Sequence, residues 1–180
     1  MRLIILDRDG VINEDSDDYI KSVDEWIPVP GSIEAIARLY QNDYRIVVAS
    51  NQSGIARGLF NMDALNRIHN RMIDAVTQKG GGIEAVFFCP HSPEQQCHCR
   101  KPRTGLFEEI ADRLKVNLST AYAVGDSLRD LEAARAVHAR PALVRTGKGA
   151  RTIAEGRGIA DVPIFDDLAA FANALLEDRF

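Results

Sequence analysis

The feature that most constrains the fold is a short apolar run near the start of the chain that ends in two carboxylates. Leu3 to Leu6 contains only branched apolar residues, which is typical of a strand buried on both faces of a parallel sheet. The run leads directly into Asp7-Arg8-Asp9-Gly10, where the glycine indicates a turn. Ligands of open α/β sheets lie just outside the carboxyl ends of the strands, so the two acids predict a cation site, a covalent nucleophile, or both. Taken alone, the same pair also fits solvated side chains in a loop.

The remainder of the chain alternates buried strands with amphipathic helices. Apolar runs predict further strands at residues 44–50, 83–88, 121–125 and 142–145, and a short edge strand at 162–165 that contains Pro163. Helical spacing of apolar residues predicts a helix capped by Ser32, helices that start near residues 61–63 and 104, and helices over 127–137 and 166–176. This alternation predicts an α/β fold with a doubly wound, mostly parallel sheet.

Length, charge and hydropathy set the broad class of protein. The 180 residues suffice for one domain with a proper core, and we expect a single domain over residues 1–180. The net charge of −4, without a basic block, argues against nucleic acid as the partner. No apolar run approaches the ~20 residues of a membrane span, and the chain starts directly in its first strand, so we expect no membrane association, no signal peptide and a cytoplasmic location. A monomer is the default expectation.

Polar residues follow four of the predicted strands. Because the carboxyl ends of parallel strands share one edge of a sheet, we expect these side chains to meet in one cleft. Each has a structural alternative when taken singly, such as a helix cap or a surface charge. No G-x-G-x-x-G follows the first strand and no Walker A motif is present, so dinucleotide and P-loop sites lose their main support. The residues, strand by strand, are Asp7 and Asp9, then Ser50 and Asn51, then Arg100 and Lys101, and finally Asp126 and Asp130.

This combination of side chains favours phosphoryl transfer. Several carboxylates at a strand edge suit Mg²⁺, a hard ion that prefers oxygen ligands. Lysine and hydroxyl donors would contact the phosphoryl oxygens, on which charge collects during transfer. One carboxylate can attack phosphorus and form an aspartyl phosphate, and a second, two residues on, can protonate the leaving alkoxide and later deprotonate water. These residues therefore predict Mg²⁺-assisted phosphoryl transfer through an aspartyl phosphate.

Four motifs resemble, in order, those of the haloacid-dehalogenase (HAD) superfamily of phosphatases: Asp7-Arg-Asp-Gly10, Ser50-Asn-Gln-Ser-Gly54, Arg100-Lys-Pro102 and Gly125-Asp-Ser-Leu-Arg-Asp130. The longer runs at 7–13 and 50–58, with Cys-Pro-His at 89–91 and Cys-x-Cys-Arg-Lys-Pro at 97–102, are similar to the D-glycero-D-manno-heptose 1,7-bisphosphate 7-phosphatases. Histidinol-phosphate phosphatases share much of this pattern. The resemblance extends from residue 3 to about residue 145. It implies a Rossmann-like HAD fold without a large cap domain, and removal of the C7 phosphate of the β-anomeric heptose bisphosphate, a precursor of lipopolysaccharide.

The resemblance also implies roles for individual residues. Asp7 would be the nucleophile, and Asp9 the general acid and base with its backbone carbonyl on Mg²⁺. Asp126 would be the third magnesium ligand, and Asp130 would either join it or only fix the other ligands. Ser50 and Lys101 would hold the phosphoryl oxygens and complete the catalytic set. The implied substrate-binding residues are Asp15, Ser16, Asp17, Asp18, Asn51, Gln52, Ser53, Arg100 and Ser127, the last of which stands where members of the family often carry lysine.

The three cysteines of the chain lie in one loop. Cys89-x-His91 and Cys97-x-Cys99 place three sulfurs and one imidazole in two close pairs, a donor set that suits tetrahedral Zn²⁺. His98 is a rival ligand to His91, although a ligand between two cysteines would crowd its neighbours. Four protein ligands leave no open position, so we expect a structural zinc-binding loop that also positions the residues directly after it. The alternative is unligated thiols in a surface loop.

Two other functions compete with a heptose bisphosphatase. Histidinol phosphate is the alternative substrate, whereas a bisphosphate needs a second cationic partner, for which Arg57, Arg100 and Arg103 are candidates. The non-enzymatic alternative is a receiver-like phosphoacceptor domain, but that fold places its acceptor aspartate after the third strand, where this chain has its cysteine loop. A zinc-dependent nucleic-acid-binding module conflicts with the acidic balance of the chain.

Overall fold

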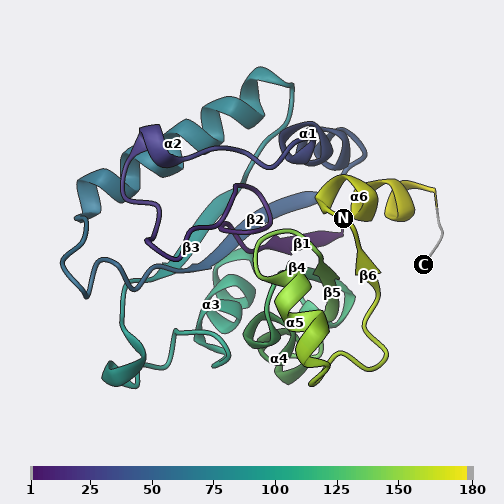
Figure 1. The fold of residues 1–180 in the computed structure, drawn as a ribbon. Helices are drawn as coiled ribbons and strands as arrows, with labels where there is room; N and C mark the ends of the chain where they lie inside the picture. Colours follow the sequence, from purple (N-terminus) through teal and green to yellow (C-terminus); the bar gives the residue numbers. More distant parts are fainter. Residues whose placement is uncertain (1, 178–180) are drawn as a thin grey trace.

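Six parallel strands form the central sheet of the structure, a computed structural model that describes residues 2–177. The strands are β1 (Leu3–Leu6), β2 (Arg45–Asn51), β3 (Ala85–Cys89), β4 (Tyr122–Gly125), β5 (Arg140–Val144) and β6 (Ile164–Phe165). Their spatial order is β3-β2-β1-β4-β5-β6, and every pairing is parallel (Figure 1). The chain moves outward from β1 through β2 to β3 and then returns to the other side of β1. The predicted doubly wound parallel sheet is confirmed, and its switch point lies between β1 and β4.

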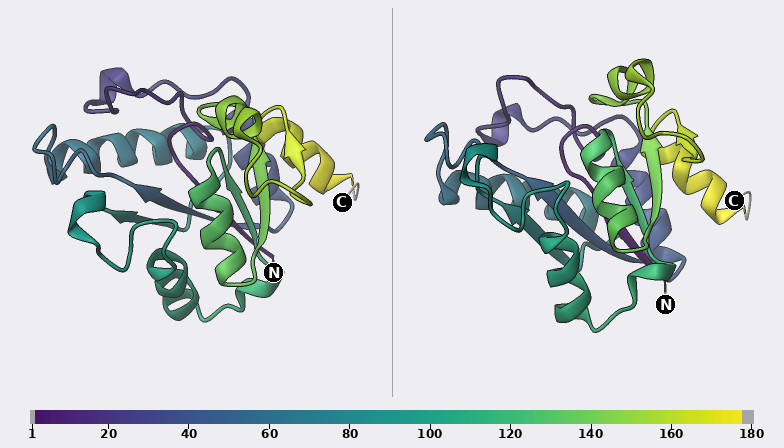
Figure 2. Two further views of the ribbon diagram at one scale, coloured as in Figure 1. Left: turned by 60° about the horizontal axis from the view of Figure 1, so that its bottom comes forward. Right: turned by 90° about the horizontal axis from the view of Figure 1, so that it is seen from below.

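Helices cover both faces of this sheet (Figures 1 and 2). One face carries α1 (Ser32–Gln41), α2 (Met62–Gln78) and α6 (Leu168–Leu176), and the other carries α3 (Gly105–Leu114) and α4 (Leu128–Ala136). The connections contain α5 (Gly149–Glu155) and three single turns of 3₁₀-helix, η1 (Val23–Glu25), η2 (Pro93–Gln95) and η3 (Leu118–Thr120). No cap-sized domain is inserted between these elements within residues 2–177.

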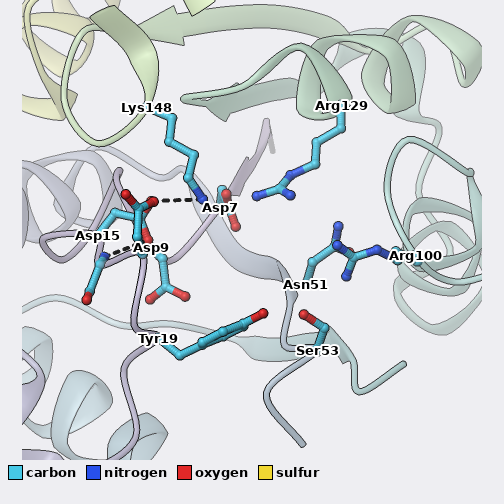
Figure 3. Close-up of a pocket in the computed structure, with 11 residues that line it drawn as sticks. Asp7, Asp9, Asp15, Tyr19, Asn51, Ser53, Arg100, Arg129 and Lys148 are labelled. Atoms are coloured by element: carbon cyan, nitrogen blue, oxygen red, sulfur yellow. Dashed lines mark hydrogen bonds and ion pairs between the residues drawn. The ribbon is translucent and has the colours of Figure 1, made fainter. Parts of the chain in front are cut away.

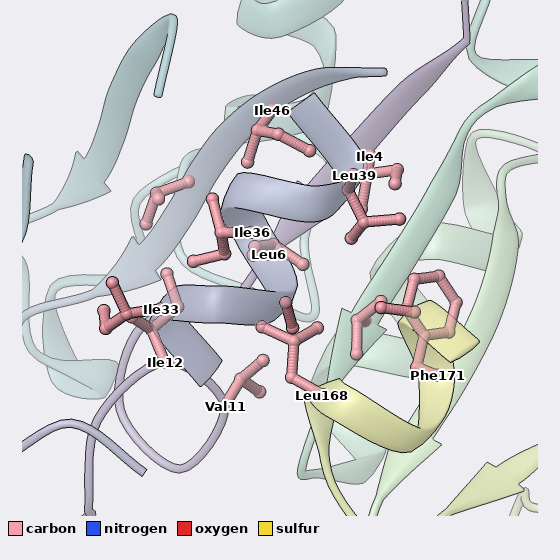
Figure 4. Packing of buried hydrophobic residues seen from close by; sticks show 14 of the residues in the cluster. Ile4, Leu6, Val11, Ile12, Ile33, Ile36, Leu39, Ile46, Leu168 and Phe171 are labelled. Atoms are coloured by element: carbon pink, nitrogen blue, oxygen red, sulfur yellow. The ribbon is translucent and has the colours of Figure 1, made fainter. Parts of the chain in front are cut away.

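Strand β1 divides its side chains between the two cores. Ile4 and Leu6 belong to the cluster under α1, α2 and α6, whereas Leu3 and Ile5 belong to the cluster under α3 and α4. This alternation follows from the two-residue period of a strand, and burial on both faces explains why the run is continuously apolar. Figure 4 shows α1 over this strand and α6 beside α1, with Phe171 of α6 over the neighbouring strands, where its ring contacts Tyr122 of β4 and Phe165 of β6. The strand is thereby held on both faces, and its end is a rigid support for the residues that follow.

Some local predictions were wrong in ways that have a physical cause. Ser32 does not cap α1, because Gly31 takes that position with φ 80° and the Ser32 hydroxyl donates to the Ile12 carbonyl at 2.6 Å. Strand β3 begins at Ala85 rather than at residue 83. Helix α5 was not predicted at all, since only two of its seven residues, Gly149 and Thr152, are buried and its sequence has no apolar stripe.

A helix can cross a lipid bilayer only if it is both long enough and apolar enough. Among residues 2–177, none of them combines the length and the apolar character needed to cross a membrane.

Candidate active site

The carboxyl edge of the sheet brings together acids from distant parts of the chain. Asp7 directly follows β1, Asp126 follows β4, and Asp130 lies in the first turn of α4. Ligand oxygens of these three carboxylates all lie within 4.8 Å of one another, and all three residues are buried. The expected convergence at the switch point therefore exists in the structure.

Lys101 is the buried cation of this cluster. Its ammonium nitrogen lies 3.1 Å from Asp7 Oδ1 and 2.6 Å from Asp130 Oδ1, and it donates to the Ala49 carbonyl at 2.7 Å. Although burial acts to lower the pKa of Lys101, the charges of Asp130 and Asp7 outweigh it and raise that pKa. Lys101 therefore remains charged and supplies positive potential beside Asp7.

Asn51 explains how the loop after β3 presents Lys101 at this point. The Asn51 amide nitrogen donates to the Lys101 carbonyl at 3.0 Å, and its amide oxygen accepts from the Lys101 backbone N–H, also at 3.0 Å. Two reciprocal bonds tie the end of β2 to the backbone of Lys101. Asn51 consequently fixes the backbone from which the Lys101 side chain extends.

Lys101 does not fully compensate the negative charge of this cluster, and the pKa values of Asp7 and Asp126 are raised. Burial, followed by the charges of Asp130 and Asp7, raises the pKa of Asp126 to about 8. The pKa of Asp7 rises to about 6, chiefly through burial and against the opposing effect of Lys101. Asp126 Oδ2 accepts from the Lys148 backbone N–H at 2.7 Å, but Asp126 Oδ1 is buried and has no hydrogen-bond partner within the described part of the chain. An unpaired buried carboxylate oxygen beside two further acids is the environment that a divalent cation stabilises.

Two glycines let the backbone approach Asp126. Gly10 has φ +86° and Gly147 has φ +58°, and a Cβ on either residue would overlap the Asp126 carboxylate. The two glycines also lie against each other, and Thr146 donates to the Gly10 carbonyl at 2.6 Å. The turn after β1 and the turn after β5 therefore form one wall around this carboxylate.

Asp9 lies in a separate set of hydrogen bonds. Its carboxylate accepts from Arg8 Nε at 2.8 Å and from a terminal Arg8 nitrogen at 3.0 Å, with further donors from Asn13 at 2.9 Å and Gln52 at 3.0 Å. Burial favours the neutral acid, but the Arg8 charge and these donors outweigh it and lower the pKa of Asp9. The two acids of the opening motif thus differ in pKa, with Asp7 raised and Asp9 lowered.

A cavity of about 110 Å³ opens above Asp7 and Asp9 (Figure 3). Acidic side chains from the loop after β1 form one side of it, and two arginines approach from the opposite side. Six residues predicted to bind substrate are among its lining residues, together with three that were not predicted. The lining residues are Asp7, Asp9, Asp15, Ser16, Asp17, Tyr19, Asn51, Ser53, Arg100, Arg129 and Lys148.

Four of the other predicted site residues do not line this cavity. The Ser127 hydroxyl donates to Asp130, and this pair caps the start of α4. Gln52 is buried and bridges Asp9 to Ser50, whose hydroxyl accepts from it at 2.7 Å. Asp18 is exposed, and its backbone N–H donates to the Ser16 hydroxyl.

Arg129 is the most informative residue that the sequence analysis missed. It lies in the first turn of α4 and points into the cavity between Asp7 and Arg100 (Figure 3). Burial opposes its charge, but Asp130, Asp7 and Asp126 raise the pKa of Arg129. Its Nε is buried and has no hydrogen-bond partner within residues 2–177. The sequence feature that could have identified Arg129 is its position inside the Gly125–Asp130 motif, directly before Asp130.

The cysteine loop forms a second cluster. The Cys89 sulfur lies 3.4 Å from the Cys97 sulfur and 3.0 Å from the Cys99 sulfur, and His91 Nδ1 lies 3.3 Å from Cys99. The four donor atoms all lie within 4.8 Å of one another, so a single ion with four tetrahedral ligands, such as zinc, could contact them all. His98 points elsewhere and pairs with Glu108 at 2.7 Å, which favours His91 as the fourth donor.

Comparisons with known proteins agree on one family. A family model described as HAD-hydrolase-like matches residues 98–171. The D-glycero-beta-D-manno-heptose-1,7-bisphosphate 7-phosphatase of Bordetella bronchiseptica is 53% identical over 99% of both chains, and that of Pseudomonas aeruginosa is 54% identical over 97% of this chain and 98% of the relative. A crystal structure of D,D-heptose 1,7-bisphosphate phosphatase from B. bronchiseptica, complexed with magnesium and phosphate, superposes with a TM-score of 0.96 over 99% of each chain at 53% identity.

The raised pKa of Asp126 predicts an inverted pH dependence of stability in the metal-free protein. Because the folded state holds a proton on Asp126 that the unfolded state releases, the free energy of unfolding should rise by about 1 kcal/mol as the pH falls from 8.5 to 7. Asp126→Asn should unfold with little change over the same range. Urea denaturation at both pH values in buffer without Mg²⁺, and without a chelator that would strip the cysteine cluster, measures this effect. A wild-type curve that is flat, or that rises with pH, would contradict the argument.

Proposed function

The chain belongs to the D-glycero-beta-D-manno-heptose-1,7-bisphosphate 7-phosphatase family of HAD-like hydrolases, and from this premise we propose that it hydrolyses the C7 phosphate of D-glycero-β-D-manno-heptose 1,7-bisphosphate. The observation that carries the proposal is that acidic and basic side chains lie on opposite sides of the cavity. Its floor holds the nucleophile and acid/base pair expected of a HAD phosphatase, and Arg100 and Arg129 face the same space from the opposite side. A substrate with an anion at each end fits this arrangement.

We propose that Mg²⁺ is held by the carboxylates of Asp7 and Asp126 and by the backbone carbonyl of Asp9. The unpartnered Asp126 Oδ1 and the raised pKa values of Asp7 and Asp126 support this donor set. Asp130 is engaged by Lys101 and Ser127, so its role is to hold those groups in place. When bound, the ion supplies charge neutralisation for the phosphoryl oxygens.

Asp7 is the nucleophile in the proposed first step. Its carboxylate oxygen attacks phosphorus, the bond between phosphorus and the C7 oxygen breaks, and the departing alkoxide takes a proton from Asp9. The negative charge of the bound ester opposes the low pKa that Asp9 has in the free protein, and so favours its protonated form. Lys101, whose ammonium lies 3.1 Å from Asp7 Oδ1, would hold the phosphoryl oxygens during the transfer. The same role stays a prediction for Ser50, whose hydroxyl bonds to Gln52 outside the cavity.

Water completes the reaction in the second step. Asp9, now ionised, removes a proton from a water molecule that attacks the phosphorus of the aspartyl phosphate. The bond between phosphorus and Asp7 breaks, and inorganic phosphate leaves. The four donors around Asp9 stabilise its ionised form, which is the form that this step requires.

The second phosphate of the substrate is the group that Arg100 and Arg129 would bind. Arg129 Nε lacks a partner in the described residues, and a guanidinium pairs well with phosphate oxygens through two parallel hydrogen bonds. Asp15, Ser16, Asp17 and Ser53 would border the sugar between the two phosphates. Histidinol phosphate carries only one phosphate and would leave this end of the cavity unpaired.

The cysteine cluster is proposed to hold one structural Zn²⁺ through Cys89, His91, Cys97 and Cys99. The four donors close the coordination shell, so the ion would have no open position for chemistry. Arg100 and Lys101 follow the last ligand directly, so the ion would fix the start of the segment that carries both. The single domain over residues 1–180, the monomer and the cytoplasmic location stay predictions.

The covalent mechanism predicts that Asp7→Asn abolishes phosphate release. The amide has no nucleophilic oxygen of comparable strength, so activity should fall by at least about 10³-fold. The exposed Asp18 lies outside the cavity, and Asp18→Asn is the matched control with unchanged turnover. Malachite-green detection of phosphate with Mg²⁺ measures both variants, and circular dichroism checks the fold. Substantial activity of Asp7→Asn would exclude the aspartyl phosphate.

The proposed second-phosphate contact predicts a change in specificity for Arg129→Met. Its kcat/KM should fall by about 10-fold or more for the heptose bisphosphate, because a charge-assisted hydrogen bond contributes about 1.5–3 kcal/mol, and should change far less for histidinol phosphate. Arg71→Met, on the exposed side of α2, is the control.

Wild-type protein assayed on both substrates tests the function itself: comparable or better turnover of histidinol phosphate would select that alternative.

The zinc proposal predicts different outcomes for two neighbouring residues. Cys99→Ala should lose the bound zinc and lower the unfolding temperature, since the metal contributes folding free energy. His98→Ala should keep both, because this imidazole pairs with Glu108 outside the cluster. Emission spectroscopy for zinc content and calorimetry measure the pair. Full zinc content in Cys99→Ala would show that the donor set is wrong.

A further inference from the structure

Arg8 is a fully buried arginine that links the opening motif to helix α2. Its side chain has a relative exposure of 0%, and it forms a two-point ion pair with Asp9. These contacts use Nε and one terminal nitrogen of the guanidinium. The second terminal nitrogen, Nη1, lies 3.3 Å from Nε2 of His69. An arginine has only donors, so His69 Nε2 must be the acceptor in this contact.

His69 is held in this position by the packing of α2. It is buried in the same helix face as Ile68 and Met72, and its ring lies 5.8 Å from that of Phe88 in β3. Burial, and then the Arg8 charge, lowers the pKa of His69 to about 3. The imidazole is therefore neutral near pH 7, with a lone pair on Nε2 that faces Arg8.

Gln52 completes the network on the other side of Arg8. Its amide oxygen accepts from Arg8 at 3.3 Å, and its amide nitrogen donates to Asp9 Oδ2 and to the Ser50 hydroxyl. The two acceptors other than Asp9 lie on or beside regular elements, with His69 on α2 and Gln52 directly after β2. Besides Asp9, the Arg8 guanidinium is thus oriented by His69 and Gln52, two residues that do not line the cavity.

We propose that His69 is a positioning residue for phosphoryl transfer, acting through Arg8 on the acid/base Asp9. The inference rests on the proposed function, and specifically on Asp9 as the proton donor to the leaving oxygen. Without an acceptor at His69, Nη1 of Arg8 would be buried without a partner, and the guanidinium would turn to find one. Such a turn breaks the two-point contact that holds the Asp9 carboxylate at the edge of the cavity.

If His69 positions Asp9, its loss should affect two classes of substrate differently, whereas a purely structural role predicts the same effect on both. An alkyl phosphate needs a proton on its leaving oxygen, whereas 4-nitrophenyl phosphate releases a stable phenolate that does not. Loss of Asp9 alignment should therefore slow the first substrate class and spare the second. General damage to the fold or to the metal site would slow both classes equally.

The test compares two substitutions of His69 that introduce the same amide group on side chains of different length. His69→Gln places an amide near the original Nε2 position and can still accept from Arg8. His69→Asn carries the same amide on a shorter side chain that does not reach. Met72→Leu, in the same buried face of α2, controls for disturbance of the core. Each variant is assayed in single turnovers with enzyme in excess, so that only departure of the leaving group is measured.

We expect His69→Asn to lower the rate for the heptose bisphosphate by about tenfold or more, within the range that general acids contribute, and the rate for 4-nitrophenyl phosphate by less than about twofold. His69→Gln and Met72→Leu should stay near wild type on both substrates. Equal losses on the two substrates, or a His69→Gln variant as slow as His69→Asn, would overturn the inference.

Wild-type controls separate the inference from the proposed function. If wild-type protein with Mg²⁺ hydrolyses neither substrate, the proposed function fails and the inference fails with it. If wild type is active and the losses are equal, only the role of His69 is refuted. Should the His69 variants not fold, Arg8→Lys keeps the charge but loses the two-point contact. The same selective loss on the bisphosphate would then support the inference, and equal losses would refute it.

Discussion

The ion network of Lys101 with Asp7 and Asp130 is the interaction on which the rest of the site depends. One buried ammonium group lies between two buried carboxylates, and a third carboxylate, Asp126, lies close by without a full set of partners. Removing one member of such a network leaves an uncompensated charge, which is costly in a buried environment. The network keeps the nucleophile close to positive charge, while the remaining deficit creates the affinity for a divalent cation. Stability and function therefore place opposite demands on the same carboxylates.

The fold separates two pKa environments that lie only two residues apart. Asp7 follows a strand buried on both faces, and its charge is opposed by burial and by neighbouring acids. Asp9 lies past the turn, where Arg8, Asn13 and Gln52 supply donors that favour its ionised form. A pair of titratable groups with divergent environments is the usual basis for dividing a reaction between nucleophile and acid/base. Here the division arises from one turn of backbone and from a buried arginine of the motif itself.

Much of this arrangement could be predicted from the sequence because strand ends of a parallel sheet share one edge. That rule was enough to bring Asp7, Lys101 and Asp126 together, and the paired spacing of the cysteines was enough to define the second cluster. Contacts between side chains were not predictable in the same way. Gln52 and Ser127 have the chemistry of substrate ligands, yet their partners are Asp9 and Asp130. Arg129 and Lys148 were missed because their roles depend on the direction of the first turn of α4 and on the loop after β5.

The contact between Gly10 and Gly147 joins residues that are 137 positions apart at the wall of the candidate site. The backbone N–H that Asp126 accepts from Lys148 belongs to the same late segment. During synthesis, a ribosome that has delivered the chain through α4 has therefore made every acidic residue of the cluster but not the whole wall that encloses it. The nascent chain gains its complete cation-binding geometry only after the segment following β5 has emerged and docked against the turn after β1.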